Sequence, residues 1–119
     1  MGPGHRRTLG AHAEDIASRY LVGQGLRPIA RNYRCRGGEI DLIMQDSNSL
    51  VFIEVRYRKD ARFGTPAATV TPAKQRKLTR AALHYLQSGK HDLACRFDVI
   101  GIHGSGNAIE WIKNAFDVV

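Results

Sequence analysis

The chain has 119 residues, of which 43% are hydrophobic, and its 18 Lys and Arg against 11 Asp and Glu give a formal net charge of +7. This length suits one domain and the apolar fraction suffices for a buried core, so the composition excludes a largely disordered chain and a multidomain protein. Every apolar run is shorter than the roughly 18 residues of a membrane-spanning helix, and no apolar stretch follows the basic start, so we expect neither a membrane segment nor a secretory signal. We expect a flexible N-terminus, residues 1–8, and one domain over residues 9–119.

The cysteines and histidines are scattered. Cys35 and Cys95 form no CxxC pair, and none of the five histidines has HxxxH spacing. These patterns are typical neither of a disulfide framework nor of a zinc site. We therefore expect two reduced thiols in a cytoplasmic protein.

The first half of the chain predicts a helix and three strands. Residues 8–24 carry apolar side chains at helical spacing, with Thr8 as N-cap and Gly23 near the end. Residues 28–34 predict a strand. Residues 39–45 and 50–58 alternate in polarity on either side of a short polar stretch, which predicts a β-hairpin.

The second half predicts a loop, a helix and two strands. Residues 61–70 are expected to be a loop, and Thr71-Pro72 is a typical helix start, with Gly89 at the end. Residues 96–102 and 109–112 predict strands on either side of a turn. Strands before and after a crossover helix indicate an α/β fold in which helices flank a mixed sheet.

The hairpin carries the candidate chemistry. If Ser47 and Asn48 are its two loop residues, Asp41 faces Glu54 and Glu39 faces Arg56. Alternation places these four charged side chains on one face of the sheet. The opposite, core-facing row is then Ile40, Leu42, Met44, Val51, Ile53, Val55 and Tyr57.

Two acids opposite each other repel and weaken a sheet, so we expect a further group that offsets the repulsion. A divalent cation resolves the repulsion, and Mg²⁺ takes one or two carboxylates with water and phosphate oxygens. Arg56 on the same face would stabilise charge developing on a phosphate. The alternative is an ordinary solvated face in which Glu39 and Arg56 form an ion pair. Ile43 and Phe52 share the face, which favours partial cover.

Two helix residues are candidates for the same face. Glu14 flanks the apolar stripe of the first helix and is within reach of the covered sheet face, although a solvated Glu is the alternative. Lys74 lies one turn before Leu78 on the inward stripe of the second helix, where it is held by the acids or by a phosphate, or extends to solvent. Arg76, Lys77 and Arg80 are expected to point away.

Positive charge is concentrated in the middle of the chain. Residues 56–80 hold eight basic residues and one acid, Asp60. A surplus of this kind attracts polyanions, of which nucleic acid is the common one. A solvated helix face is the alternative interpretation. No basic helix has the apolar opposite face of a membrane-surface helix, so a membrane partner is not expected.

Four blocks of the sequence resemble the YraN-like family of small bacterial proteins, which is itself similar to the restriction-endonuclease-like, or PD-(D/E)XK, superfamily. The resemblance covers residues 10–116 and implies a three-layer core of helix, hairpin-containing mixed sheet and helix. It places the motif acids on Asp41 and Glu54, the basic motif position on Arg56, and a first-helix acid on Glu14. The blocks are residues 38–43, 51–58, 71–75 and 96–99.

The sequence departs from the superfamily motif at its basic position. Arg56 stands where the motif has lysine, and an arginine stays protonated, so any hydrolysis needs its water activated by metal. The resemblance implies Mg²⁺ or Mn²⁺ at Asp41, Glu54 and Glu14, with nucleic acid, DNA in the first instance, as the partner. The residues expected to contact it are Arg58, Lys59, Arg62, Lys74 and Gln75.

Three functions follow. The first is a Mg²⁺-dependent endonuclease that hydrolyses phosphodiester bonds of DNA, with structured or branched DNA among the substrates. The second is a non-catalytic nucleic-acid-binding module with a degenerate site. The third is a protein-interaction domain, paired as a homodimer through an exposed strand edge.

Overall fold

The computed structural model describes residues 9–58, 66–89, 93–104 and 108–117. The expected N-terminus, residues 1–8 with the cap Thr8, lies outside the described residues, as do Lys59 and Arg62. The elements follow the predicted order of helix, three strands, helix and two strands. They are α1 (Leu9–Gly23), β1 (Arg27–Cys35), β2 (Gly38–Asp46), β3 (Ser49–Arg58), α2 (Pro72–Gln87), β4 (Ala94–His103) and β5 (Ala108–Phe116).

The five strands form one sheet in the order β1-β2-β3-β4-β5. Only β3 and β4 pair in parallel, because the chain crosses over through α2 between them, and the other neighbours are antiparallel. The predicted mixed α/β sheet with a hairpin and flanking helices is therefore confirmed. The edge strands are β1 and β5, and the expected homodimer through such an edge stays a prediction.

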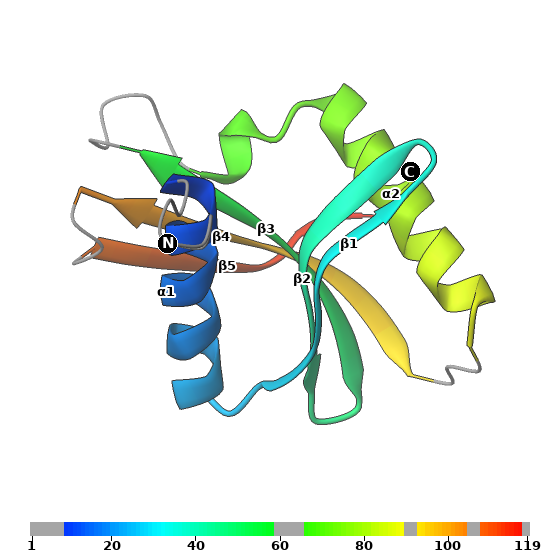
Figure 1. The fold of residues 1–119 in the computed structure, drawn as a ribbon, viewed down its shortest axis with the longest axis horizontal. Coiled ribbons are helices and arrows are strands. Elements are labelled where there is room, and N and C mark those ends of the chain that lie inside the picture. The colour runs from blue at the N-terminus through cyan, green and yellow to red at the C-terminus, as the bar shows by residue number, and fades with distance from the viewer. Residues whose placement is uncertain (1–8, 59–65, 90–92, 105–107, 118–119) are drawn as a thin grey trace, which may run out of the picture.

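The helices cover opposite faces of the sheet, which makes three layers. In Figure 1, α1 lies at the left and α2 at the right of the twisted sheet. The α1-side core joins Ala13, Ala17 and Leu21 to Leu42, Met44, Val51, Ile53, Ile100 and Ile102. The α2-side core joins Leu78, Ala81 and Ala82 to Ile40, Ile43, Leu50, Phe52, Phe97 and Val99.

The start of α2 follows from local sequence. The Thr71 side chain accepts a hydrogen bond of 3.2 Å from the backbone N–H of Lys74, and Pro72 occupies the first helical turn. This cap satisfies an N–H that the helix cannot pair internally. The predicted helix start is confirmed, and it fixes where Lys74 leaves the helix.

The hairpin register is also confirmed. Leu42 pairs with Ile53 and Gln45 with Leu50, with Ser47 and Asn48 left as the loop. Ser47 has a φ of 52°, the left-handed conformation that two-residue hairpin turns require. The register turns the predicted aliphatic row of β2 and β3, from Leu42 onward, to the α1-side core.

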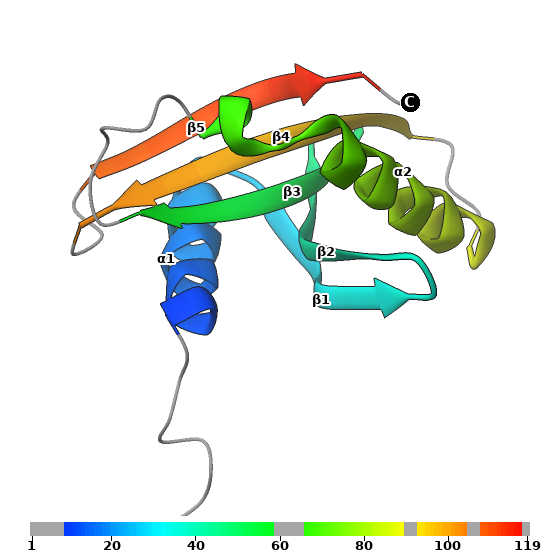
Figure 2. The same cartoon turned by 90° about the horizontal axis from the view of Figure 1, so that it is seen from above.

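The prediction fails at the open end of the hairpin, where the described β2–β3 ladder ends at Leu42 and Ile53. Glu39 is not opposite Arg56. It pairs with Arg34 of β1, whose Nε lies 3.1 Å from its carboxylate. Ile40 does not share a face with Leu42, as the predicted row requires, but is buried in the α2-side core. Both errors arise because β2 leaves β3 here and follows β1 towards α2, as Figure 2 shows.

The β4–β5 edge is tied together by a fully buried acid. The Asp98 carboxylate accepts hydrogen bonds of 2.9 Å from the indole N–H of Trp111 and from the backbone N–H of Asn114. Arg96 binds the same carboxylate at 3.0 Å and reaches Asp46 of β2 at 2.8 Å. This buried charge is therefore paired, as its environment requires.

Within the described residues, neither helix has the length and apolar character needed to span a lipid bilayer.

Candidate functional site

The candidate site lies where β2 parts from β3, and we call Asp41, Glu54 and Val55 the fork. Asp41 Oδ2 accepts a hydrogen bond of 2.8 Å from the backbone N–H of Val55. The carboxylate thus binds the Val55 N–H, which would donate to a backbone carbonyl of β2 if the ladder continued. This hydrogen bond holds the Asp41 side chain against β3, the strand that carries Glu54.

Glu54 is buried in the sheet beneath two cations. Its side chain is 5% exposed. Its Oε2 lies 3.3 Å from Arg56 Nη2 and 3.9 Å from Lys74 Nζ. Lys74 therefore points inward, as its place on the helix stripe predicted, and the acid that holds it is Glu54.

Asp41 and Glu54 are strongly coupled. Burial first, and then the negative charge of Asp41, raise the pKa of Glu54 from 4.5 to about 7, and a hydrogen bond between the two carboxyl groups acts in the same direction. Lys74 and Arg56 lower this pKa but do not outweigh the burial. Glu54 thus favours holding a proton beside Asp41, or having a cation in the place of that proton.

Glu14 approaches the fork from α1. It is buried, and its Oε1 lies 3.7 Å from Arg31 Nη2 with no hydrogen-bond partner in the described part of the chain. Burial and then the charge of Asp41 raise the pKa of Glu14, against the opposing effects of Asn32 and Arg31. The alternative of a solvated helix glutamate is therefore wrong, because α1 carries Glu14 onto the sheet.

Arg56 is held on two sides. One Nη2 contact goes to Glu54, and the other, at 3.5 Å, goes to the backbone carbonyl of Thr69 in a short 3-10 helix, Ala67–Thr69. Its Nε has no hydrogen-bond partner among the described residues. The guanidinium therefore keeps one buried N–H donor that is not paired within the described residues.

The expected nucleic-acid contacts are only partly described. Gln75 uses its side chain to donate a 3.0 Å hydrogen bond to the Val70 carbonyl, which braces the start of α2. Arg58 ends β3 and is half-buried. Lys59 and Arg62 lie outside the described residues, so their expected role stays a prediction.

The donor set of the fork suits a hard cation. Where the chain is described, no group of three or more His, Cys, Asp and Glu side chains is arranged to hold a metal ion. The half-buried Asp41 and the buried Glu54 nevertheless place two carboxyl groups side by side, and Mg²⁺ needs only one or two protein carboxylates. Oε1 of Glu14, which accepts no hydrogen bond from the described residues, belongs to a carboxyl group whose pKa the charge of Asp41 raises.

Lys77 and Arg80 point away from the inward stripe of α2, as predicted, and are exposed. Together with Lys74 they line one groove beside β2, which the sequence analysis does not predict. The sequence offered no signal for this, because the groove's other wall is the β1–β2 turn, which reaches α2 only through the bend at Asp41.

The chain is similar to other proteins along nearly its whole length. A family model described as "Uncharacterised protein family UPF0102" matches residues 13–102. The chain is 54% identical to a UPF0102 protein of Saccharophagus degradans over 94% of both chains. It is 52% identical to one of Nitrosococcus oceani over 99% of this chain and 98% of the relative. A relative from Nitrosomonas eutropha is 56% identical over 93% of this chain and 95% of its own length.

Proposed function

Since the chain belongs to the uncharacterised protein family UPF0102, the YraN-like family expected from its sequence, we propose a function from the fork itself. The protein binds nucleic acid and acts as a Mg²⁺-dependent endonuclease on DNA. The observation that carries this proposal is the pair of half-buried Asp41 and buried Glu54 with Arg56 and Lys74 beside it. Paired acids next to two cations suit a metal-bound phosphodiester.

The fold gives this proposal support of its own. A central hairpin that brings acids from two strands to one point, with a helix on each face, fits the restriction-endonuclease-like superfamily. We therefore propose that Asp41 and Glu54 correspond to its motif acids and Glu14 to its first-helix acid. A fold alone carries no activity, so the weight lies on the site.

The chain's own residues would divide the work. Asp41 and Glu54 would hold the cation, with Glu14 close to it. A bound Mg²⁺ or Mn²⁺ would supply an activated water and polarise the phosphoryl oxygens. Arg56 and Lys74 would shift from Glu54 to the phosphate and stabilise its growing negative charge.

The proposed reaction is hydrolysis. The water oxygen forms a new bond to phosphorus, and the bond from phosphorus to the bridging sugar oxygen breaks. The leaving oxygen takes up a proton, which gives a sugar hydroxyl and a phosphate monoester. Arg56 does not accept the water's proton, because a guanidinium stays protonated.

The test is a cleavage assay on end-labelled single-stranded, duplex, flap and four-way-junction DNA with Mg²⁺ or Mn²⁺. We expect cleavage of at least one substrate, lost with a chelator and in Asp41→Asn and Glu54→Gln. The matched control is Asp46→Asn, because Asp46 is a β2 carboxylate that binds Arg96 and not the fork. Cleavage that survives in both fork variants would reject the proposal.

The second candidate is a non-catalytic nucleic-acid-binding module. The observation that favours it is Arg56, which stands at the basic motif position and binds Glu54 directly. In that case no substrate is cut under any metal condition, and Arg56→Lys does not restore cutting. Affinity for DNA is then unchanged or raised in Asp41→Asn, since a negative charge near phosphate is removed.

A further inference from the structure

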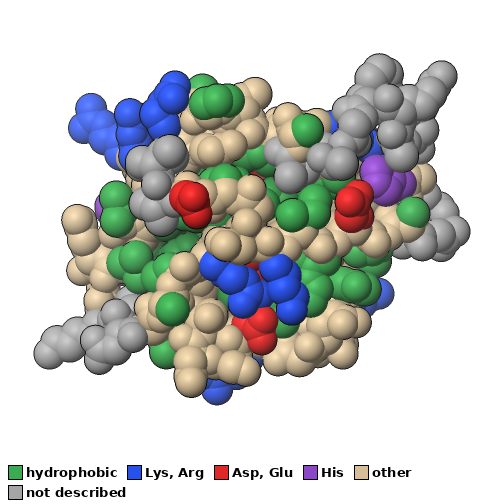
Figure 3. Space-filling view, turned by 180° about the vertical axis from the view of Figure 1, so that it is seen from behind, with side chains coloured by type: hydrophobic (Ala, Val, Ile, Leu, Met, Phe, Trp, Pro, Cys, Tyr) green, Lys and Arg blue, Asp and Glu red, His purple; other side chains and the backbone are tan. Residues whose placement is uncertain are grey.

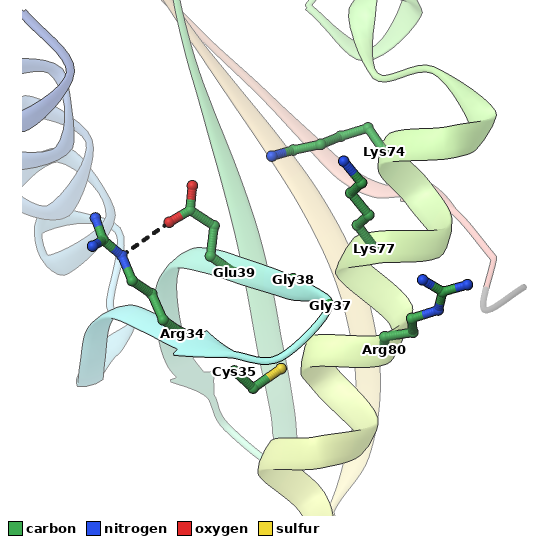
Figure 4. Close-up of a pocket in the computed structure, with 8 residues that line it drawn as sticks. All are labelled: Arg34, Cys35, Gly37, Gly38, Glu39, Lys74, Lys77 and Arg80. Carbon is green, nitrogen blue, oxygen red and sulfur yellow. Dashed lines mark hydrogen bonds and ion pairs between the residues drawn. The ribbon is translucent and has the colours of Figure 1, made fainter.

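A basic groove runs between the β1–β2 turn and α2. It has a volume of about 630 Å³. One wall comes from Lys74, Lys77 and Arg80, and the other from Arg34, Cys35, Gly37, Gly38 and Glu39. Figure 4 shows Lys74 extending from α2 towards the side that Arg34 and Glu39 occupy. Because Lys74 also contacts Glu54, the groove leads to the fork.

The groove carries a surplus of unpaired positive charge. Arg34, Lys74, Lys77 and Arg80 face one acid, Glu39, which is bound to Arg34 at 3.1 Å. Lys77 and Arg80 are exposed and have no ion pair among the described residues. On the face in Figure 3, by contrast, the central Lys and Arg side chains lie beside Asp and Glu. The groove is thus a local site for anions.

The shape of the groove is fixed by backbone contact. A Cβ on Gly38 would lie 2.2 Å from the carbonyl oxygen of Lys77, so the turn and α2 touch where only glycine fits. The turn itself has Gly37 at a φ of 99°. Both walls are therefore formed before any ligand binds, which lowers the cost of ordering on binding.

The residues that line the groove suit phosphate groups and provide no surface that would recognise a base. Among the described residues that line the groove there is no aromatic side chain, and the least polar side chain is that of Cys35. A mononucleotide site would need apolar or aromatic walls for the base. A site for an acidic peptide would need buried anchors of the kind that dominate protein interfaces. Repeated phosphates along a strand need only the cations.

We propose that this groove binds the sugar–phosphate backbone of a nucleic-acid strand and leads it to the fork. The inference rests on the proposed function through Lys74, which lines the groove and contacts Glu54. Recognition is independent of base sequence, because the groove offers charges and no base-reading wall.

The first test compares two double variants with equal loss of charge. Lys77→Gln/Arg80→Gln removes two groove cations, whereas Arg76→Gln/Arg19→Gln removes two exposed cations outside the groove. With a labelled single-stranded oligonucleotide and fluorescence anisotropy, we expect roughly tenfold weaker binding for the groove variant and under about twofold for its control. The slope of log affinity against log salt should fall by roughly 0.7 for each phosphate that the variant no longer neutralises.

The second test reads the groove directly through Cys35. In a Cys95→Ser chain, iodoacetamide should alkylate Cys35 more slowly as the oligonucleotide fills the groove. The exposed Cys95, in a Cys35→Ser chain, lies outside the groove and should react at an unchanged rate. Thymidine monophosphate, inorganic phosphate and a poly-glutamate peptide serve as competing probes and should protect Cys35 less at equal concentration of charge.

The outcomes separate this proposal from the cleavage proposal. Equal oligonucleotide affinity in the two double variants would reject the proposal that the groove binds a nucleic-acid backbone. The same proposal would be rejected if the peptide or a monophosphate protected Cys35 as well as the oligonucleotide does. Neither result affects a cleavage assay that depends on Asp41 and Glu54. Conversely, a groove that passes both tests while no substrate is cut would leave the groove in place and reject the nuclease.

Discussion

The carboxylate of Asp41 accepts a 2.8 Å hydrogen bond from the backbone N–H of Val55, and β2 and β3 separate at this point. One side chain therefore has two effects. It ends the ladder by taking a backbone donor, and it brings an acid next to Glu54. The local fold and the candidate chemistry depend on the same residue.

The first prediction concerns Asp41→Asn. The amide oxygen can still accept from Val55, so the fold should persist while the negative charge is lost. Because that charge raises the pKa of Glu54, we expect the pKa to fall from about 7 towards 4.5, and that of Glu14 to fall with it. Carboxyl ¹³C NMR titration measures both, with Asp46→Asn as control. An unchanged Glu54 pKa would contradict the coupling.

The second prediction concerns the pH dependence of stability. The pKa of Glu54 is about 7 in the folded chain against 4.5 when unfolded, so the folded state holds this proton more tightly. The free energy of unfolding should therefore decrease as pH rises from about 4.5 to about 7, by about 3 kcal/mol from this group, and level off above. Urea unfolding at several pH values tests this.

Glu54→Gln is the comparison for that experiment, because it removes the titrating group and keeps the size of the side chain. The difference in unfolding free energy between the unchanged chain and Glu54→Gln should therefore change between about pH 4.5 and about pH 7, as predicted for Glu54. A difference that stays flat between pH 4.5 and pH 7 would show that Glu54 titrates normally.

The third prediction concerns Mg²⁺. At pH 8 Glu54 is ionised, and Mg²⁺ at ten times its Kd should raise the free energy of unfolding by about 1.4 kcal/mol. At pH 5 the proton competes and the effect should vanish. Thermal unfolding with Mg²⁺ checks this, with Glu54→Gln as the chain that should not respond. Equal stabilisation at both pH values would place the ion elsewhere.

The fourth prediction concerns Gly38→Ala. The new methyl would lie 2.2 Å from the Lys77 carbonyl oxygen, and backbone cannot move aside as a side chain can. We expect a loss of about 1–3 kcal/mol in unfolding free energy and weaker oligonucleotide binding, as the groove wall is displaced. Gly23→Ala is the control, because a Cβ there meets nothing within 4 Å. Equal effects of the two changes would contradict the close contact.

Much of the fold could be predicted from the sequence because it is encoded locally. Alternation of polarity gave the register of the hairpin, from Leu42 to Ile53, and a Thr-Pro pair gave the start of α2. That register predicts Asp41 opposite Glu54, and the two acids do interact, although the ladder itself ends one pair earlier. The inward position of Lys74 followed from its place one turn before Leu78.

The rest depends on contacts between distant parts of the chain. Ile40 and Glu39 were misplaced because alternation assumes a continuous ladder, and the hydrogen bond from Val55 to Asp41 interrupts it. The groove that Lys77 and Arg80 line could not be predicted, because a helix pattern tells which residues face the sheet and not which neighbour stands beside the helix. That neighbour, the β1–β2 turn, is brought there by the bend.

Trp111 is the only tryptophan of the chain, and its indole N–H is bound to the buried Asp98 at the β4–β5 edge. Its fluorescence emission therefore reports on the environment of that edge of the sheet. Its partners are on β4 and α1, not on the groove wall, so ligand titrations in the groove should leave the spectrum constant while denaturation shifts it. A shift of the tryptophan emission during a ligand titration would therefore report unfolding and not occupancy of the groove.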